Sequence, residues 1–491
     1  MARLLISAAH KSSGKTTITL GLCAALRRRG LTVQPFKKGP DYIDPMWLSR
    51  AAAQPCHNLD FQTQSETEIR DTFTRYPADV RIIEGNMGLF DSIDVEGRHS
   101  NAALAALLQT PVVLVVNVLG MTRSVVPIIL GYQHFDPSIR IAGVILNSVA
   151  GKRHEERLRE VFARYIDIPL LGCIHRDPEL AISERHLGLV PSNEAVEVDT
   201  KLDYIAAAIE RQVDLDQLLA LARDIAPLVT PEPSAGISIH PAAIPPGSPH
   251  GGHPLGKTPP PPPPRPEGGG TKVRIGIARD AAFGFYYPGD LERLQEAGAE
   301  LVPFDTLRDP HLPAVDGLFI GGGFPETHMA ALEANAGLRQ DIHAAIEAGL
   351  PTYAECGGLM YLARSIRWGD QRCAMVGIIP GDIVMYEKPQ GRGYVQLRET
   401  GHNPWPGAGA PAEFFAHEFH YSMLENLSPG LTYAYDMLRG TGVDGRHDGI
   451  VYRNLVANYV HLRDVEGYHW TRRFVDFVRL CSRRQREAGI A

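Results

Sequence analysis

The sequence predicts two α/β domains joined by a linker, and three observations support this prediction. Short apolar runs rich in β-branched residues alternate with segments of helical periodicity in both halves of the chain. A stretch rich in proline and glycine separates the two halves. The chain has 491 residues, which is too long for one ordinary hydrophobic core and favours two or three domains.

The N-terminal half contains short runs that are apolar throughout, as expected for strands of a parallel sheet that is covered on both faces. They are RLLIS at 3–7, VRIIE at 80–84, PVVLVVN at 111–117 and AGVILN at 142–147. The helical stretch at 15–30 ends at Gly30, a typical residue for a helix C-terminus. The C-terminal half repeats the pattern with VRIGIA at 273–278, GLFIGGG at 317–323 and PTYAE at 351–355.

The break between the halves is a change of composition. Residues 231–271 are dominated by proline and glycine, which remove backbone donors and stiffness that a packed element needs. Such a segment is typical of a linker, part extended polyproline and part flexible chain. We therefore predict one domain at 1–226, a linker at 227–271 and a second domain at 272–485.

Composition excludes several classes of protein. The net charge of -7 is unlike the basic footprint of a nucleic-acid-binding protein. The sequence contains no apolar run long enough for a membrane span, and its first ten residues do not form a signal peptide. Its six cysteines are far apart, without a C-x-x-C pair, which argues against a disulfide framework or a thiolate zinc site. We expect a soluble, cytoplasmic protein with no nucleic-acid or membrane partner; a homo-oligomer stays open.

The first candidate site is the stretch AAHKSSGKTT at 8–17, which resembles a phosphate-binding loop but has Ala9 where the usual motif has glycine. It lies between a predicted strand and a predicted helix, so backbone N–H groups would point at an anion. We expect Gly14, Lys15, Thr16 and Thr17 to bind ATP, with Lys15 on the β and γ phosphates and Thr16 on Mg²⁺. Taken alone, the tripeptide Gly-Lys-Thr is equally typical of helix capping.

Polar residues follow other predicted strands of the same half, where open α/β sheets bind their ligands. Glu84 ends one strand and is a candidate Mg²⁺ ligand. Asp41 and Asp44 follow another strand, next to Lys37, which could bind phosphate or a substrate carboxylate. Asn147 ends a third strand and is suited to an adenine edge, or to an ordinary turn. Singly, each carboxylate is typical of a helix cap, but together they favour a site.

The second candidate site is in the C-terminal half. Cys356 stands between the run PTYAE and an expected amphipathic helix, an arrangement that exposes a nucleophile and places it at a helix N-terminus. Gly321, Gly322 and Gly323 end an earlier strand and could form an oxyanion hole, and His461 is a candidate base. An isolated cysteine or histidine is usually a core residue, but these three elements in this order favour nucleophilic catalysis.

At these residues the chain resembles the cobyrinate a,c-diamide synthase family of corrinoid biosynthesis, which includes relatives acting on sirohydrochlorin-type macrocycles. The resemblance spans both domains. It rests on GKTT, QPFKKGPDYIDP, NLD at 58–60, EGNMGLFDS, RDPELAISERHLGLVPS, FIGGGFPE, AECGGLMYL and NYVHLR.

The resemblance implies an enzyme with two sites. A class I glutamine amidotransferase domain would release ammonia from glutamine through a thioester on Cys356, with His461 as the base. A domain like dethiobiotin synthetase would use ATP and Mg²⁺ to phosphorylate the a and c acetate carboxylates of a tetrapyrrole, and ammonia would then displace phosphate. Lys15 and Thr16 match the ATP loop, and Asp41 and Glu84 match positions for metal or phosphate. The resemblance also places Tyr42, Asp44 and Asp91 in loops near the phosphoryl group and the macrocycle.

The chain departs from the family at three places. The linker is longer than a join between two domains requires. Relatives commonly read G-T-x-S-G-V-G-K-T in the loop, where this chain has alanine, lysine and serine at positions that are usually glycine or small. They also tend to have histidine two residues after the base, where this chain has Arg463, and no glutamate follows as in three-member triads. Cys356 and His461 could therefore act as a pair, with a third member open.

Several alternatives stay open at the level of sequence. The macrocycle could be cobyrinate, hydrogenobyrinate, nickel sirohydrochlorin or sirohaem. A regulatory ATPase of the ParA or MinD type is an alternative for the first half, although it leaves Cys356 unexplained and would carry its signature lysine at the position of His10. A cysteine hydrolase that needs no ATP is an alternative for the second half.

Overall fold

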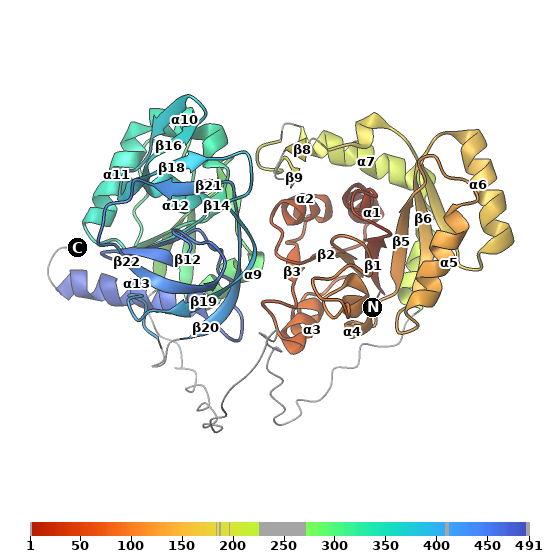
Figure 1. The fold of residues 1–491 in the computed structure, drawn as a ribbon, viewed down its shortest axis with the longest axis horizontal. Coiled ribbons are helices and arrows are strands. Elements are labelled where there is room, and N and C mark those ends of the chain that lie inside the picture. The colour runs from red at the N-terminus through yellow and green to blue at the C-terminus, as the bar shows by residue number, and fades with distance from the viewer. Residues whose placement is uncertain are drawn as a thin grey trace, which may run out of the picture.

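The structure is a computed structural model that describes residues 2–182, 184–185, 188–195, 197–224, 272–407 and 412–487. Figure 1 shows the two α/β halves lying side by side, with α2, α3 and β9 of the first half facing the second. The linker predicted at 227–271 lies outside the described residues, so its boundaries stay a prediction.

The described part of the N-terminal half contains a sheet of seven parallel strands in the order β3-β2-β4-β1-β5-β6-β7. The strands are β1 (Ala2–Ala8), β2 (Val33–Lys38), β3 (His57–Leu59), β4 (Val80–Glu84), β5 (Val112–Asn117), β6 (Ile141–Val149) and β7 (Leu170–His175). All four strands predicted in this half are confirmed. Their side chains are almost entirely buried, because helices cover both faces of a parallel sheet.

The helices of this half are α1 (Lys15–Arg28), α2 (Ile43–Ala52), α3 (Glu66–Arg75), α4 (Asn101–Leu107), α5 (Val125–Phe135), α6 (Lys152–Tyr165), α7 (Val198–Gln212) and α8 (Leu215–Arg223). A short 3-10 turn, Pro178–Leu180, and the pair β8 (Glu184–Arg185) and β9 (Gly188–Leu189) connect β7 to α7.

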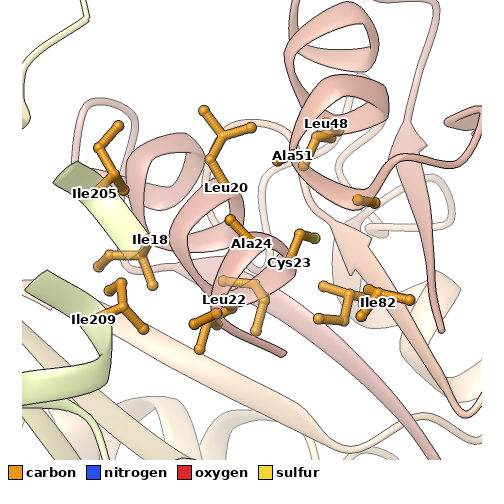
Figure 2. Packing of buried hydrophobic residues seen from close by; sticks show 14 of the residues in the cluster. Ile18, Leu20, Leu22, Cys23, Ala24, Leu48, Ala51, Ile82, Ile205 and Ile209 are labelled. Carbon is orange, nitrogen blue, oxygen red and sulfur yellow. The ribbon is translucent and has the colours of Figure 1, made fainter. Parts of the chain in front are cut away.

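Helix α1, which carries Lys15 and Thr16, is fixed by tight packing. Ile18 and Leu22 of this helix lie close to Ile205 and Ile209 of α7 (Figure 2). A Cβ at Gly21 would lie 2.3 Å from Ile209, so only glycine permits this approach of the two helices. The start of α1 is therefore held rigidly at the carboxyl end of the sheet.

The described part of the C-terminal half contains a nine-stranded mixed sheet in the order β12-β10-β13-β15-β24-β23-β22-β19-β20. Its first five strands are parallel: β12 (Ala299–Phe304), β10 (Val273–Ala278), β13 (Gly317–Ile320), β15 (Thr352–Glu355) and β24 (Leu455–Asn458). The others are antiparallel: β23 (His447–Tyr452), β22 (Thr432–Arg439), β19 (Gly391–Glu399) and β20 (Glu413–His420). The three strands predicted here are β10, β13 and β15, so the α/β prediction is confirmed for both halves.

Smaller elements complete this half. A second sheet has the order β17 (Gln371–Ala374), β16 (Ala363–Trp368), β18 (Ile379–Met385) and β21 (Ser422–Glu425), and β11 (Phe283–Phe285) pairs with β14 (Gly322–Gly323). The helices are α9 (Pro288–Glu296), α10 (Met329–Ala334), α11 (Ala336–Glu347), α12 (Gly357–Leu362) and α13 (Trp470–Glu487), with a 3-10 turn at Pro325–His328.

The helix expected after Cys356 is shorter than the sequence suggested. Helix α12 has six residues, and all of them are buried, so it is not amphipathic. The chain continues from Ala363 as strand β16, because the second sheet pairs with these residues. The expectation of an amphipathic helix was wrong.

Two findings bear on the composition analysis. All six cysteines are unpaired and buried. In the ranges of the chain that the structure describes, no helix is long and apolar enough to cross a membrane.

Candidate active sites

The loops after β2 and β4 bring one lysine together with a group of acidic side chains. Lys37 Nζ lies 2.5 Å from Asp44 Oδ2, 3.0 Å from Glu84 Oε1 and 4.0 Å from Asp41 Oδ2. Burial lowers the pKa of Lys37, but the charges of Asp44 and Glu84 outweigh burial and raise it above its usual value. The lysine is therefore held charged in the middle of the cluster, and Asp41, with 37% of its side chain exposed, is the most accessible carboxylate of the three.

Glu84 connects this cluster to the phosphate-binding loop. Its carboxylate is fully buried, and Oε1 accepts hydrogen bonds from Thr16 Oγ1 at 2.6 Å and from Lys37. Its other oxygen, Oε2, is buried without a hydrogen-bond partner among the described residues. Burial raises the pKa of this carboxyl group. An unpaired carboxylate oxygen beside a threonine hydroxyl is the donor set that Mg²⁺ uses next to phosphates, so these residues fit the ion.

The predicted phosphate-binding loop turns into α1 at Gly14, despite its unusual sequence. Gly14 has φ 89° and directly precedes α1. Ala9 has no positive φ, so glycine is not needed there, and its carbonyl accepts a hydrogen bond from the Tyr132 hydroxyl. Lys15 is buried, which lowers its pKa, while Glu84 opposes that effect.

Asn147 makes a hydrogen bond to this loop, and Asp91 makes one to the loop after β4. Asn147 Nδ2 donates to the Ser13 carbonyl at 2.9 Å, and a Cβ at Gly14 would lie 2.2 Å from that nitrogen. Asp91 Oδ2 accepts from the Gly88 N–H at 2.8 Å. Both residues thus stabilise loops at this edge of the sheet, and contacts of Asn147 with adenine stay a prediction.

Cys356 occupies a sharp turn between β15 and α12. Its backbone has φ 46° and ψ -102°, a conformation that costs energy for a residue with a side chain. The turn is held because the Cys356 N–H donates to the carbonyl of Asn458, the last residue of the neighbouring strand β24, at 2.7 Å. This strained turn between strand and helix is the arrangement expected of a nucleophile.

His461 follows β24 and lies beside this turn. Its Nδ1 is 3.4 Å from Oε2 of Glu355, the residue before the cysteine. Burial lowers the pKa of His461, but hydrogen bonding to Cys356 and Glu355 outweighs burial and raises it to about 10. Cysteine, histidine and a carboxylate therefore meet, as the sequence analysis expected for the first two.

The three candidate oxyanion-hole glycines lie close to this pair. The N–H of Gly321 donates to the Tyr286 hydroxyl at 3.0 Å and is already engaged. A Cβ at Gly322 would lie 2.5 Å from Cε1 of His461, and a Cβ at Gly357 would lie 2.9 Å from the nitrogen of Gly323. Glycine is required here because backbone and imidazole approach so closely. The role of these N–H groups stays a prediction.

The two sites share a wall of aromatic side chains. Tyr42, which stands between Asp41 and α2, lies 4.8 Å from the ring of His461. Its ring also lies 4.5 Å from Tyr287 and 5.5 Å from Phe285, both from the C-terminal half. Tyr42 therefore contacts the base of one site while its sequence neighbour Asp41 belongs to the other.

Polar contacts reinforce this boundary. Arg463, two residues after the base, reaches across to the Asn58 carbonyl and to the Thr63 hydroxyl. Asn58 Nδ2 in turn donates to the Asp41 carbonyl at 2.8 Å. These contacts tie the segment after the base to the acidic loop.

The structure thus brings together Lys15, Thr16, Lys37, Asp41, Asp44 and Glu84 in one site, and Cys356 and His461 in the other. The sequence analysis missed Glu355 as a partner of His461, although the motif AECGG shows a glutamate next to the nucleophile. It also missed the contact between Tyr42 and His461, for which a single sequence holds no signal.

A nucleotide-binding loop on a parallel sheet and a cysteine–histidine site on a neighbouring α/β half define a synthetase coupled to a glutaminase, and comparison with known proteins agrees. Residues 5–190 match the model of the CobQ/CobB/MinD/ParA nucleotide binding domain. Residues 274–464 match the model of the CobB/CobQ-like glutamine amidotransferase domain.

Full-length relatives narrow the class further. The chain is 47% identical over 467 residues to a cobyrinate a,c-diamide synthase of Magnetococcus marinus, covering 95% of this chain and 94% of the relative. It is 39% identical to the protein of that name from Methanosarcina acetivorans, over 94% of this chain and 92% of the relative. The chain therefore belongs to the cobyrinate a,c-diamide synthase family.

Proposed function

We propose that this protein amidates the a and c acetate carboxylates of cobyrinate, using ATP for activation and glutamine as the nitrogen donor. The single observation that supports this best is the joint presence of both sites in one chain that aligns with its relatives over almost its entire length. The relatives are named for cobyrinate, so sirohaem and nickel sirohydrochlorin become outcomes of the test.

Activation takes place at the first site. A carboxylate resists attack by ammonia because an oxide leaving group is poor, and transfer of the γ-phosphoryl group of ATP turns it into a mixed anhydride. Lys15 would neutralise charge on the transferring group, and Lys37 would hold a carboxylate or phosphate oxygen. Thr16, Glu84 and Asp41 would hold Mg²⁺, which when bound neutralises phosphate charge.

Ammonia is released at the second site. The Cys356 thiolate attacks the carboxamide of glutamine, giving a glutamyl thioester and ammonia, and water then releases glutamate. Ammonia displaces phosphate from the mixed anhydride and leaves the amide. Tyr42 separates the two reactions in space, and ammonia would pass this residue to reach the activated carboxylate.

The synthetase domain would comprise residues 1–226 and the amidotransferase domain 272–485, with a linker between them. We expect the protein to act in the cytoplasm. Gly14 and Thr17 would contact ATP with Lys15, and Asn147 would lie near the adenine.

A regulatory ATPase of the ParA or MinD type is a weaker candidate, although the first family model covers such proteins. This alternative does not account for Cys356. The cysteine has a strained backbone and lies beside His461, which in turn lies beside Glu355.

The deciding experiment supplies ATP, Mg²⁺ and glutamine together with cobyrinate, sirohydrochlorin, nickel sirohydrochlorin or sirohaem, and weighs the products by mass spectrometry. Each amidation exchanges an OH for an NH₂. We expect two amidations of cobyrinate and ADP formation that requires a macrocycle. ATP hydrolysis indifferent to every macrocycle, with glutamine unaltered, would contradict the proposal.

A further inference from the structure

The carboxylate next to the nucleophile has its two oxygens in different surroundings. Glu355 is buried at the end of β15, and its Oε1 accepts hydrogen bonds from the Tyr353 hydroxyl and, at 2.9 Å, from the Leu462 N–H. Its Oε2 lies 3.4 Å from Nδ1 of His461. Oε1 thus anchors the group, and Oε2 is directed at the base.

We propose that Glu355 is the positioning residue of the glutaminase site, which orients His461 through Nδ1 and stabilises its charged form. The inference rests on the proposed function of this site. It completes a set of three in which the carboxylate precedes the nucleophile in sequence instead of following the base.

The position two residues after the base is used for something else in this chain. Arg463 stands there, and its guanidinium extends to Asn58 and Thr63 of the other half and over the ring of Tyr287. A basic side chain directed away from the base cannot orient an imidazole. In the part of the chain that the structure describes, Glu355 is the carboxylate seen beside the imidazole of His461.

Apart from Cys356, Glu355 is the group facing His461 that can balance the positive charge of its imidazole. The groups facing His461 are Cys356 and Glu355 on one side, His417 of β20 on another, and Tyr42 across the domain boundary. Burial, followed by the charge of His461, lowers the pKa of His417 to about 3, so His417 is neutral. Burial raises the pKa of Tyr42, which is neutral as well.

The proton path follows from this geometry. Because Nδ1 faces Glu355, Nε2 is the nitrogen left for the thiol. Nε2 takes the proton of Cys356 before the attack, so that the thiolate forms the sulfur–carbon bond, and Nε2 then gives this proton to the departing ammonia as the carbon–nitrogen bond breaks. Glu355 would accept a hydrogen bond from Nδ1–H, which is buried and has no hydrogen-bond partner among the described residues. The contact of 3.4 Å is long, as such contacts often are without substrate.

The test is Glu355→Gln in the full-length protein. Glutamine can keep one acceptor for Tyr353 and Leu462, but it places an NH₂ group, a donor, opposite Nδ1 and favours the wrong imidazole tautomer. We expect kcat for glutamine hydrolysis to fall about 100-fold with a small change in KM. We also expect the midpoint of the pH dependence of Cys356 alkylation by iodoacetamide to move upward, because the imidazolium that stabilises the thiolate loses its partner.

The matched control is Asp448→Asn. Asp448 is also a fully buried carboxylate, and it accepts hydrogen bonds from the N–H groups of Tyr459 and Val460, in the same segment that Glu355 holds at Leu462. A merely structural role would make both variants behave alike. We expect Asp448→Asn to lower stability without moving the alkylation profile.

Three outcomes distinguish the possibilities. If Glu355→Gln keeps the kcat and pH profile of the unmodified protein, or if Asp448→Asn reproduces its effects, the inference is wrong. If the unmodified protein shows no glutamine hydrolysis that depends on Cys356, the proposed function fails instead. If Glu355→Gln does not fold, Glu355→Asp is the second variant, because it keeps the charge but moves it away from His461 by one methylene. A lowered kcat for glutamine hydrolysis with unchanged ammonia-dependent amidation then supports the positioning role of Glu355.

Discussion

The two active sites solve the problem of buried charge in opposite ways. In the synthetase site, Lys37 lies among Asp41, Asp44 and Glu84, so opposite charges already neutralise one another. In the glutaminase site, one carboxylate faces one imidazole, and aromatic rings form the adjacent wall. In the first arrangement, a bound nucleotide and metal ion can replace ion pairs within the protein. In the second, the carboxylate fixes the imidazole that passes a proton to and from the cysteine.

The strongest test of this comparison removes the nucleophile. Cys356→Ala should lower glutamine-dependent amidation by about 10⁴-fold, because no thioester can form. Amidation supplied with ammonium chloride should continue, since the synthetase site is intact. Product mass spectrometry with each nitrogen source measures both. Cys373→Ala, a change at another buried cysteine, is the control and should leave both activities in place; loss of ammonia-dependent amidation in Cys356→Ala would mean that the sites are not separable.

A change in the synthetase site should have the opposite effect: amidation is lost and glutamine hydrolysis is kept. Lys15→Met should lower amidation about 10³-fold with either nitrogen source, because charge on the transferring phosphoryl group is no longer neutralised. Glutamine hydrolysis should persist. Assays of ADP and glutamate measure the two activities separately, and Lys152→Ala, at an exposed lysine of α6, is the control. Equal loss of glutaminase activity would contradict independent chemistry.

The charge cluster itself can be broken. Lys37→Met should lower the free energy of unfolding by about 3 kcal/mol, because buried carboxylates lose their counter-ion. Urea unfolding measures the loss. The double variant Lys37→Met/Asp44→Asn should recover part of it, since one unpaired charge is removed; no recovery would show that the cluster is not held together by charge.

The shared wall gives a smaller effect. Tyr42→Ala should lower the amount of amide formed per glutamine hydrolysed about tenfold, because the barrier between the sites is opened and ammonia escapes. Comparing glutamate with amide product gives this ratio. Tyr42→Phe keeps the ring and should keep the ratio, so an equal drop in both variants would assign the effect to the hydroxyl.

The smallest effect lies outside both sites. Hydrogen bonds and charge from Arg364, with Ser365 adding a further hydrogen bond, hold the pKa of Asp382 well below its usual range. Because the pKa of this carboxyl group is lower in the folded state, the ionised group stabilises the fold above its unfolded pKa of about 4. This stabilisation is lost as the pH falls from that value through the lower pKa of the folded state. Asp382→Asn should therefore cost about 1 kcal/mol at pH 7, because the arginine is half exposed. The loss of stability should disappear in acid. Urea unfolding at pH 7 and in acid measures it, and neither glutamine hydrolysis nor amidation should change.

The strand pattern, the phosphate-binding loop and the elbow at Cys356 could be predicted from the sequence, because each depends on residues close together in the chain. Apolar runs predict buried parallel strands, and the two family models match the halves that those runs delimit. The helix after Cys356 was predicted to be amphipathic, but it is short and buried, because pairing of β16 with β17 and β18, a tertiary interaction, overrides the local preference of the residues after it.

What the sequence determined by itself was the chemistry available: a lysine and threonine for phosphate, carboxylates for a metal, a cysteine and a histidine for glutamine. Only the tertiary structure decided which groups meet. Glu355 and His461 are far apart in sequence, and the parallel pairing of β15 with β24 brings them together. Tyr42 and His461 are also far apart, and they meet where the two halves pack. Contacts between distant segments depend on how sheets and helices pack, and a single sequence holds no local signal for them.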